Sequence, residues 1–194
     1  MRIIAGTMKG HQLKVPRSRR TRPMSQRIRE ALFMVLSTLG VQPRRVLDLY
    51  AGSGGIGIEA LSRGAEWCDF VEQNPAACAV IRDNLASTRF ADRAAVHQTT
   101  VQAYLARPLE PYDLVIMDPP YADPHIVEMM RRVAQSRAVR VGTVLALGHW
   151  PRLELPEQIG PLRRLRQRCH GDSCFSIYEV VEPPEAAGAA STEG

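Results

Sequence analysis

From residue 45 onward, short apolar runs alternate with stretches of helical periodicity. The apolar runs predict strands at residues 46–49, 68–72, 95–97, 112–117 and 142–147. The helical periods predict helices at residues 56–63, 75–87 and 124–136. Short strand–helix units of this kind close as a parallel sheet with helices on both faces. The sequence therefore predicts an α/β, doubly wound domain.

Hairpins are predicted at both ends of this core. Residues 3–6 and 12–15 flank a glycine-containing connection, which is typical of a short N-terminal β-hairpin. Near the C-terminus, residues 162–168 and 175–181 flank the turn-forming residues 170–173 and predict an antiparallel hairpin at one sheet edge. These two strands bring the predicted, mostly parallel sheet to seven strands.

The chain divides by composition into three parts. Residues 1–24 form a basic hairpin and arm, and residues 25–182 hold the main domain. The main domain opens with a predicted helix over residues 26–39, which Ser25 can cap. Residues 183–194 are small, polar and without pattern, so we expect them to be disordered.

Positive charge is concentrated at the N-terminus. Residues 1–30 contain nine Lys or Arg and one acid, a net charge of +8, whereas the rest of the chain carries −3. A local excess of cations favours a polyanion as partner, because each neutralised phosphate releases counterions. A solvated basic arm is the alternative. No segment has the length and apolarity of a membrane span or the order of a signal peptide, so we expect a cytoplasmic protein that binds no membrane.

The four cysteines show no CxxC pair. Cys169 and Cys174 have the wrong spacing for a common zinc knuckle. We therefore expect no metal, and a turn flanked by two buried thiols in preference to a disulfide.

A glycine-rich loop follows the first predicted strand. Gly52, Gly54 and Gly57 satisfy G-x-G-x-x-G at the strand-to-helix turn, where ligands bind in open α/β sheets. NAD and S-adenosylmethionine both require glycine here, because a side chain would block approach to the backbone. Glu72 ends the second strand and also fits both ligands, since an acid there can accept hydrogen bonds from ribose hydroxyls.

Asp48 favours S-adenosylmethionine of the two. Its carboxylate precedes the loop, where it can meet the cationic amino end of a methionine moiety. In a dinucleotide site, an acid close to the pyrophosphate would be repelled.

The fourth strand ends in Asp118-Pro119-Pro120-Tyr121. The Asp118 carboxylate and the Pro119 carbonyl can accept both hydrogens of an exocyclic amine and so aim its nitrogen lone pair at an electrophile. The prolines stiffen the loop and donate no competing N–H, and Tyr121 can stack on a base turned out of its own stack. In isolation D-P-P-Y is a tight turn, but after a glycine-rich loop in the same sheet it predicts transfer to nitrogen.

Together these residues resemble the RsmD-type bacterial methyltransferases, over residues 1 to about 181. The resemblance rests on residues 2–6, 22–23, 27–33, 48–57, 59–65, 70–72 and 118–121. It implies a Rossmann-like methyltransferase fold and transfer of methyl from S-adenosylmethionine to the exocyclic N2 of a guanine in 16S ribosomal RNA. The expected substrate is the small ribosomal subunit or an assembly intermediate, and the expected state is a monomer.

The resemblance also implies residue roles. The catalytic motif is Asp118, Pro119, Pro120 and Tyr121. The cofactor is held by Asp48, Ala51, Gly52, Gly54 and Glu72, and by Thr100 near the adenine, with Thr99 as the alternative. The RNA-facing residues are Arg17, Arg19, Arg20, Arg22 and Arg27.

The chain departs from the usual sequence of the family at two places. Met24-Ser25-Gln26 stands where the family often has Thr-Thr-Asp, so contacts made by that acid are absent here. The fifth strand runs into Leu147-Gly148-His149-Trp150, where the family often has an acid. His149 or Trp150 either lines the base pocket or packs at the sheet edge.

Three other functions remain open from sequence alone. D-P-P-Y fixes only an amine or amide nitrogen as acceptor, so the substrate can also be DNA adenine or a protein glutamine. Gly52, Gly54, Gly57 and Glu72 permit an NAD-dependent oxidoreductase. The basic arm alone is consistent with a catalytically silent RNA-binding module.

Overall fold

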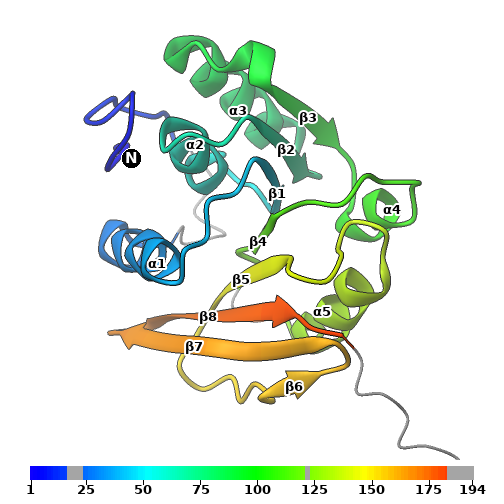
Figure 1. The fold of residues 1–194 in the computed structure, drawn as a ribbon. Coiled ribbons are helices and arrows are strands. Elements are labelled where there is room, and N and C mark those ends of the chain that lie inside the picture. The colour runs from blue at the N-terminus through cyan, green and yellow to red at the C-terminus, as the bar shows by residue number, and fades with distance from the viewer. Residues whose placement is uncertain (17–23, 121–122, 183–194) are drawn as a thin grey trace, which may run out of the picture.

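The computed structural model describes residues 1–16, 24–120 and 123–182 (Figure 1). Within these residues, eight strands form one sheet in the order β3-β2-β1-β4-β5-β8-β7-β6. Their bounds are Arg45–Leu49 (β1), Trp67–Glu72 (β2), Ala94–Gln98 (β3), Leu114–Met117 (β4), Val144–His149 (β5), Gln158–Ile159 (β6), Leu162–His170 (β7) and Ser173–Val180 (β8). Strands β1 to β5 run parallel, and β8, β7 and β6 add to β5 in antiparallel fashion.

The predicted fold is confirmed, with one strand more than expected. The additional strand is β6, a two-residue pairing at the edge, which is too short to carry any periodicity in sequence.

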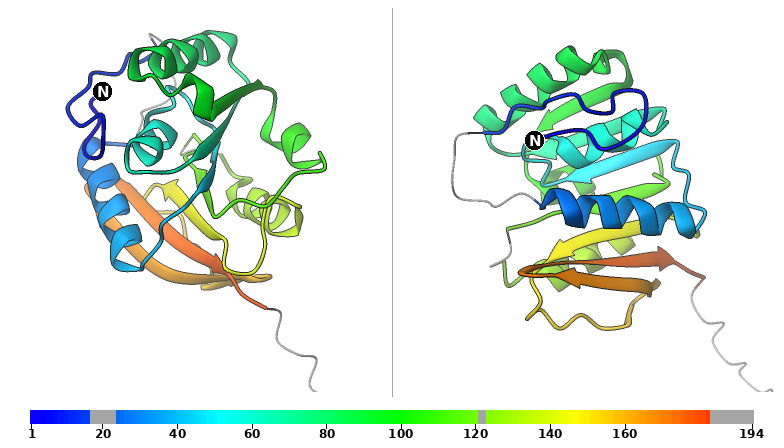
Figure 2. Two further views of the ribbon diagram at one scale, coloured as in Figure 1. Left: turned by 45° about the horizontal axis from the view of Figure 1, so that its top comes forward. Right: turned by 90° about the vertical axis from the view of Figure 1, so that its left-hand side faces the viewer.

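Helices cover both faces of the sheet (Figure 2). Their bounds are Gln26–Thr38 (α1), Gly55–Ser62 (α2), Pro75–Thr88 (α3), Val101–Leu105 (α4) and Ile126–Gln135 (α5), with a short 3₁₀ turn at Ala91–Arg93. Successive strand residues point to opposite faces, so Val46 packs with α1, α2 and α3, whereas Leu47 packs with α4 and α5. None of the described helices has the length and apolar character of a transmembrane span.

The strand order reverses at β1, which lies between β2 and β4. The loops after β1 and β4 therefore leave the sheet side by side, and a crevice opens at the carboxyl ends of the strands. This topology brings the glycine-rich loop, the end of β2 and Asp118 to one edge of the sheet.

The N-terminal segment packs onto α2 and α3. The chain reverses as predicted, but the strand pairing is limited to one antiparallel bridge between Arg2 and Gln12. The buried Glu59 carboxylate accepts hydrogen bonds from the amides of Ile4 (2.8 Å) and Ala5 (3.0 Å). Further along, the Asn84 side chain exchanges hydrogen bonds with the backbone of Lys14. The segment is thus fixed to the body at both ends.

The expectation of two buried thiols at the C-terminal hairpin is wrong. Cys169 and Cys174 form a disulfide, and Cys169 is exposed. The antiparallel pairing of β7 and β8 places the two residues directly opposite each other, with their Cα atoms 4.0 Å apart. Spacing in sequence did not reveal this, because the proximity comes from strand register.

Candidate active site

The glycine-rich loop turns sharply between β1 and α2. Gly52 has φ +56°, a left-handed conformation that favours glycine, and the nearest atom to a Cβ there would be the Tyr50 carbonyl oxygen at 4.0 Å. Gly57 is needed for a different reason, because a Cβ there would lie 2.4 Å from the Phe70 ring. Glycine therefore permits the turn at Gly52 and close packing of helix on strand at Gly57.

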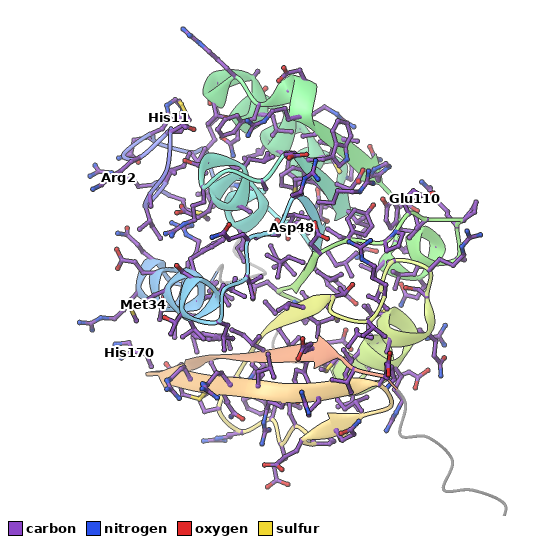
Figure 3. The ribbon with its side chains drawn as sticks, viewed as in Figure 1. Arg2, His11, Met34, Asp48, Glu110 and His170 are labelled. Carbon is purple, nitrogen blue, oxygen red and sulfur yellow. A yellow bond between two sulfur atoms is a disulfide. The ribbon has the colours of Figure 1, made fainter. Side chains whose placement is uncertain are left out.

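Asp48 lies buried beneath this loop (Figure 3). One carboxylate oxygen accepts the Gly57 amide at 2.9 Å, which ties the strand to the helix N-terminus. Burial raises the pKa of Asp48 well above its ordinary value, and the neighbouring carboxylates of Asp118 and Glu72 raise it further. A cationic ligand in this place would relieve that cost.

Glu72 extends from the end of β2 to the same loop. Its two oxygens accept the amides of Gly52 at 3.0 Å and Asn74 at 2.8 Å. Each carboxylate oxygen has a second lone pair, so Glu72 can still accept hydrogen bonds from ligand hydroxyls.

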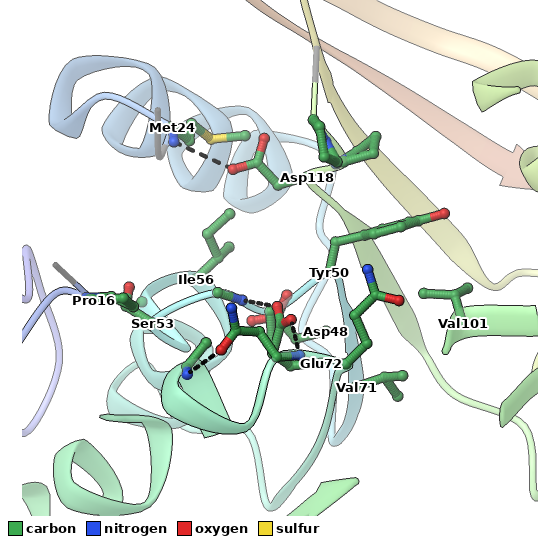
Figure 4. Close-up of a pocket in the computed structure, with 18 of the residues that line it drawn as sticks. Pro16, Met24, Asp48, Tyr50, Ser53, Ile56, Val71, Glu72, Val101 and Asp118 are labelled. Atoms are coloured by element: carbon green, nitrogen blue, oxygen red, sulfur yellow. Dashed lines mark hydrogen bonds between the residues drawn. The ribbon is translucent and has the colours of Figure 1, made fainter. Parts of the chain in front are cut away.

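Asp118 leaves the end of β4 on the opposite side of the crevice. Its Oδ2 accepts the Met24 amide at 3.2 Å (Figure 4), whereas Oδ1 is buried with no hydrogen-bond partner among the described residues. Burial raises the pKa of Asp118 to about 6. An unsatisfied buried acceptor is costly and rare in folded proteins, so Oδ1 is poised for a donor from a ligand.

Gly148 provides the space for this carboxylate. A Cβ at Gly148 would lie 2.3 Å from Asp118 Oδ1 and 3.0 Å from the Met24 methyl group. The backbone of Gly148 is not in the left-handed region, so the absent side chain matters only for packing.

Asp48, Gly52, Glu72 and Asp118 line one pocket of about 660 Å³. Among the described lining residues, the charged side chains are four carboxylates, those of Asp48, Glu72, Asp118 and Asp123, and one guanidinium, that of Arg29. The Arg29 side chain is buried, which lowers its pKa, and it donates to the carbonyl oxygen of Arg2. The pocket is therefore acidic, and it suits a cationic ligand better than a phosphate.

Most of the predicted site residues that the structure describes meet in this pocket. Those that line it are Asp48, Ala51, Gly52, Glu72, Thr100, Asp118, Pro119 and Pro120. Gly54 instead caps the N-terminus of α2, and the Thr100 hydroxyl caps α4 by accepting the Ala103 amide. Arg27 lies on α1 beside His170, at 2.9 Å. Tyr121, Arg17, Arg19, Arg20 and Arg22 lie outside the described residues.

His149 and Trp150 do not line this pocket as the structure describes it. His149 is buried in the sheet, where its ring nitrogens contact the Ser176 hydroxyl and the Trp150 carbonyl, each at 2.9 Å. Trp150 is 39% exposed. His149 therefore packs inside the sheet, on β5 between β4 and β8, and not at a sheet edge as the second alternative had it.

The sequence analysis missed Met24 and Gly148 as parts of the site. Met24 had been noted only as a departure from a family pattern, and nothing in the sequence indicated its contact with a residue 94 positions away. Gly148 carries no chemical group, so its role becomes visible only as a space beside Asp118.

Comparisons with known proteins agree with this geometry. Residues 1–179 match the family model described as Conserved hypothetical protein 95. YlbH of Bacillus subtilis strain 168, named as a candidate rRNA methyltransferase, is 31% identical over 92% of this chain and 98% of its own. Ribosomal RNA small subunit methyltransferase D of Escherichia coli K12 is 38% identical over 62% of this chain and 60% of its own.

A solved structure shows the same architecture. It is described as a candidate methyltransferase of Escherichia coli, yhhF, and superposes with a TM-score of 0.82 at 28% identity. The match covers 93% of this chain and 98% of the other.

Proposed function

The chain belongs to the Conserved hypothetical protein 95 family of RsmD-type rRNA methyltransferases, and we propose that it methylates the exocyclic N2 of a guanine in 16S ribosomal RNA with S-adenosylmethionine as donor. The observation that carries the proposal is Asp118, which lines the acidic pocket and whose buried Oδ1 has no donor among the described residues.

The lining of the pocket supports S-adenosylmethionine over NAD. When bound, S-adenosylmethionine supplies a methyl group on a positively charged sulfonium, and it also carries an ammonium group. Asp48 and Asp118 contribute negative charge that attracts such a ligand and would repel a pyrophosphate. Gly52 presents an open backbone, and Glu72 can accept hydrogen bonds from the ribose hydroxyls.

Asp118 orients the nucleophile in this proposal. Its free Oδ1 and the Pro119 carbonyl accept the two hydrogens of the guanine N2 amine, which turns the nitrogen lone pair away from the ring. The carboxylate can also accept the proton that the nitrogen loses. Tyr121 is proposed to stack on the extruded base, and Thr100 to approach the adenine.

The RNA is proposed to approach from the N-terminal side of the pocket. Pro16 and Met24 flank the arginine-rich residues 17–23, and both line the pocket that holds Asp118. We further propose that residues 1–24 serve RNA binding, that the protein acts as a monomer, and that the substrate is the small subunit or an assembly intermediate.

Two measurements with purified protein test the proposal. Calorimetric titration should show binding of S-adenosylmethionine to wild type and to Asp118→Ala, and none of NAD. With methyl-labelled donor, wild type should label 16S RNA in small subunits that lack the modification, and Asp118→Ala should not. Label that enters only DNA or protein, or equal transfer by Asp118→Ala, would refute the assignment.

A further inference from the structure

A row of arginines on β7 lies outside the region of the predicted RNA arm. Four arginines occur between residues 163 and 168, although the chain beyond residue 30 carries a net negative charge. Arg163 and Arg164 are paired with Glu179 and Glu157. Arg166 and Arg168 are exposed and donate only to neighbouring backbone carbonyls, with no carboxylate within 4.0 Å among the described residues.

A β-bulge aims these two arginines toward α1. Arg164 pairs with Tyr178, whose side chain packs on the α5 face of the sheet. The register then shifts between Arg164 and Arg166, so that Arg166 pairs with Ile177 on the α1 face. Paired residues project from the same face, and bulges commonly redirect side chains next to active sites. Without the bulge, Arg166 would lie on the opposite face.

On the α1 face these arginines join Arg27. Arg27 is exposed on α1, and its guanidinium contacts the His170 ring at the end of β7, 2.9 Å away. We name Arg27, Arg166 and Arg168 the hairpin cations. Two acids lie near the hairpin cations in sequence: Glu30, three residues from Arg27 on α1, and Asp172, in the turn beyond the row.

The hairpin cations lie at the edge of the sheet that carries the active site. Asp118 follows Met117, which pairs with Leu147, and the next residue of β5, Gly148, pairs with Phe175. Phe175 in turn pairs with Arg168. Three inter-strand spacings of about 4.8 Å separate β4 from β7 across β5 and β8. Arg168 therefore lies roughly 14 Å from Asp118. That distance equals about four stacked nucleotides at 3.4 Å each.

From this arrangement we propose that the hairpin cations bind the phosphate backbone of the ribosomal RNA next to the target base, so that the RNA-binding surface extends from Arg27 onto β7. The inference rests on the proposed function and adds a second phosphate-binding surface to it. Guanidinium groups suit phosphate oxygens because their donors can bind two oxygens at once.

The test compares two double variants of equal charge loss. R166A/R168A removes cations from the proposed surface, whereas R131A/R132A removes two exposed arginines from α5 on the other face. Affinity for small subunits lacking the modification is measured over a range of salt concentrations, and S-adenosylmethionine affinity reports an intact pocket. We expect R166A/R168A to bind subunits roughly tenfold more weakly, with a salt slope lower by about 1 to 2. The control should match wild type.

The outcomes separate this proposal from the proposed function. If wild type methylates the RNA but R166A/R168A binds with wild-type affinity and salt slope, the surface is wrong and the function stands. If wild type binds the subunits through this surface without methylating them, the surface stands and the function is wrong. Equal weakening of both double variants would mean a general charge effect and would overturn the surface.

Discussion

Asp118 holds a buried carboxylate oxygen at a cost in stability, and the same oxygen can bind a substrate amine. Its Oδ2 is held by the Met24 amide, while the buried Oδ1 has no partner among the described residues. Native proteins satisfy nearly all buried polar atoms, so an exception calls for a functional reason. An amine hydrogen from the substrate would supply the missing donor.

The charge on Asp118 should therefore reduce stability above pH 6. Its pKa is raised to about 6 in the fold, so the fold favours the protonated form, and that stabilisation is lost as pH rises from about 4 through 6. Asp118→Asn keeps an acceptor for Met24 and removes the charge. We expect its free energy of unfolding at pH 8 to exceed that of wild type by about 1 to 3 kcal/mol, with little difference at pH 4.

Thermal unfolding at the two pH values checks this prediction. Asp118→Asn should also be inactive, and wild-type turnover should fall as pH drops through about 6, since the protonated carboxyl loses an acceptor site. Equal unfolding temperatures for both proteins at pH 8 would show that the ionised Asp118 carboxylate does not destabilise the fold.

Gly148 should be required for turnover and dispensable for cofactor binding. In Gly148→Ala the new methyl group would lie 2.3 Å from Asp118 Oδ1, so the carboxylate must shift. Misplacement by about 1 Å can reduce a rate by about 100-fold, and we expect a loss of 10- to 100-fold in methyl transfer. Affinity for S-adenosylmethionine, measured by calorimetry, should stay within about twofold. Wild-type turnover in this variant would mean that the carboxylate position is not critical.

At the level of elements, Glu59 joins the N-terminal segment to α2. It is fully buried and accepts the amides of Ile4 and Ala5 and the guanidinium of Arg63. Glu59→Ala leaves these donors without their acceptor, and we expect about 3 to 5 kcal/mol of lost stability. Glu66→Ala, which removes an exposed partner of Arg44, is the matched control and should cost under about 1 kcal/mol.

Denaturant unfolding and amide exchange measure the effect of Glu59→Ala. The Ile4 and Ala5 amides should exchange faster in this variant and at the wild-type rate in Glu66→Ala. If both variants unfold alike, the N-terminal segment does not depend on Glu59 for its attachment.

The elements that sequence predicted well are those with long periodic patterns. The strands around Asp48, Glu72 and Asp118 were placed within two residues, because both of their faces are buried and they are mostly apolar. The five-residue α4 and the two-residue β6 were missed, since neither is long enough to show a period. The disulfide between Cys169 and Cys174 was missed because it depends on hairpin register.

For the molecule as a whole, topology explains which site residues were predictable. Asp48, Glu72 and Asp118 each end a strand or lie close to its end, so a correct parallel sheet is enough to bring them together. Met24, Gly148 and the hairpin cations required the structure, because they reach the site through packing, empty space and a bulge. None of these three features leaves a pattern in the sequence.

The central claim is that Asp118 directs methyl transfer to a guanine amine of the small-subunit RNA. The most direct test maps methylated nucleotides by mass spectrometry in 16S RNA from cells lacking this protein, before and after incubation of their small subunits with wild type or Asp118→Ala and S-adenosylmethionine. The account predicts one N2-methylguanosine that is absent beforehand, restored by wild type and not by the variant. An unchanged methylation map, or a restored mark on any other base, would contradict it.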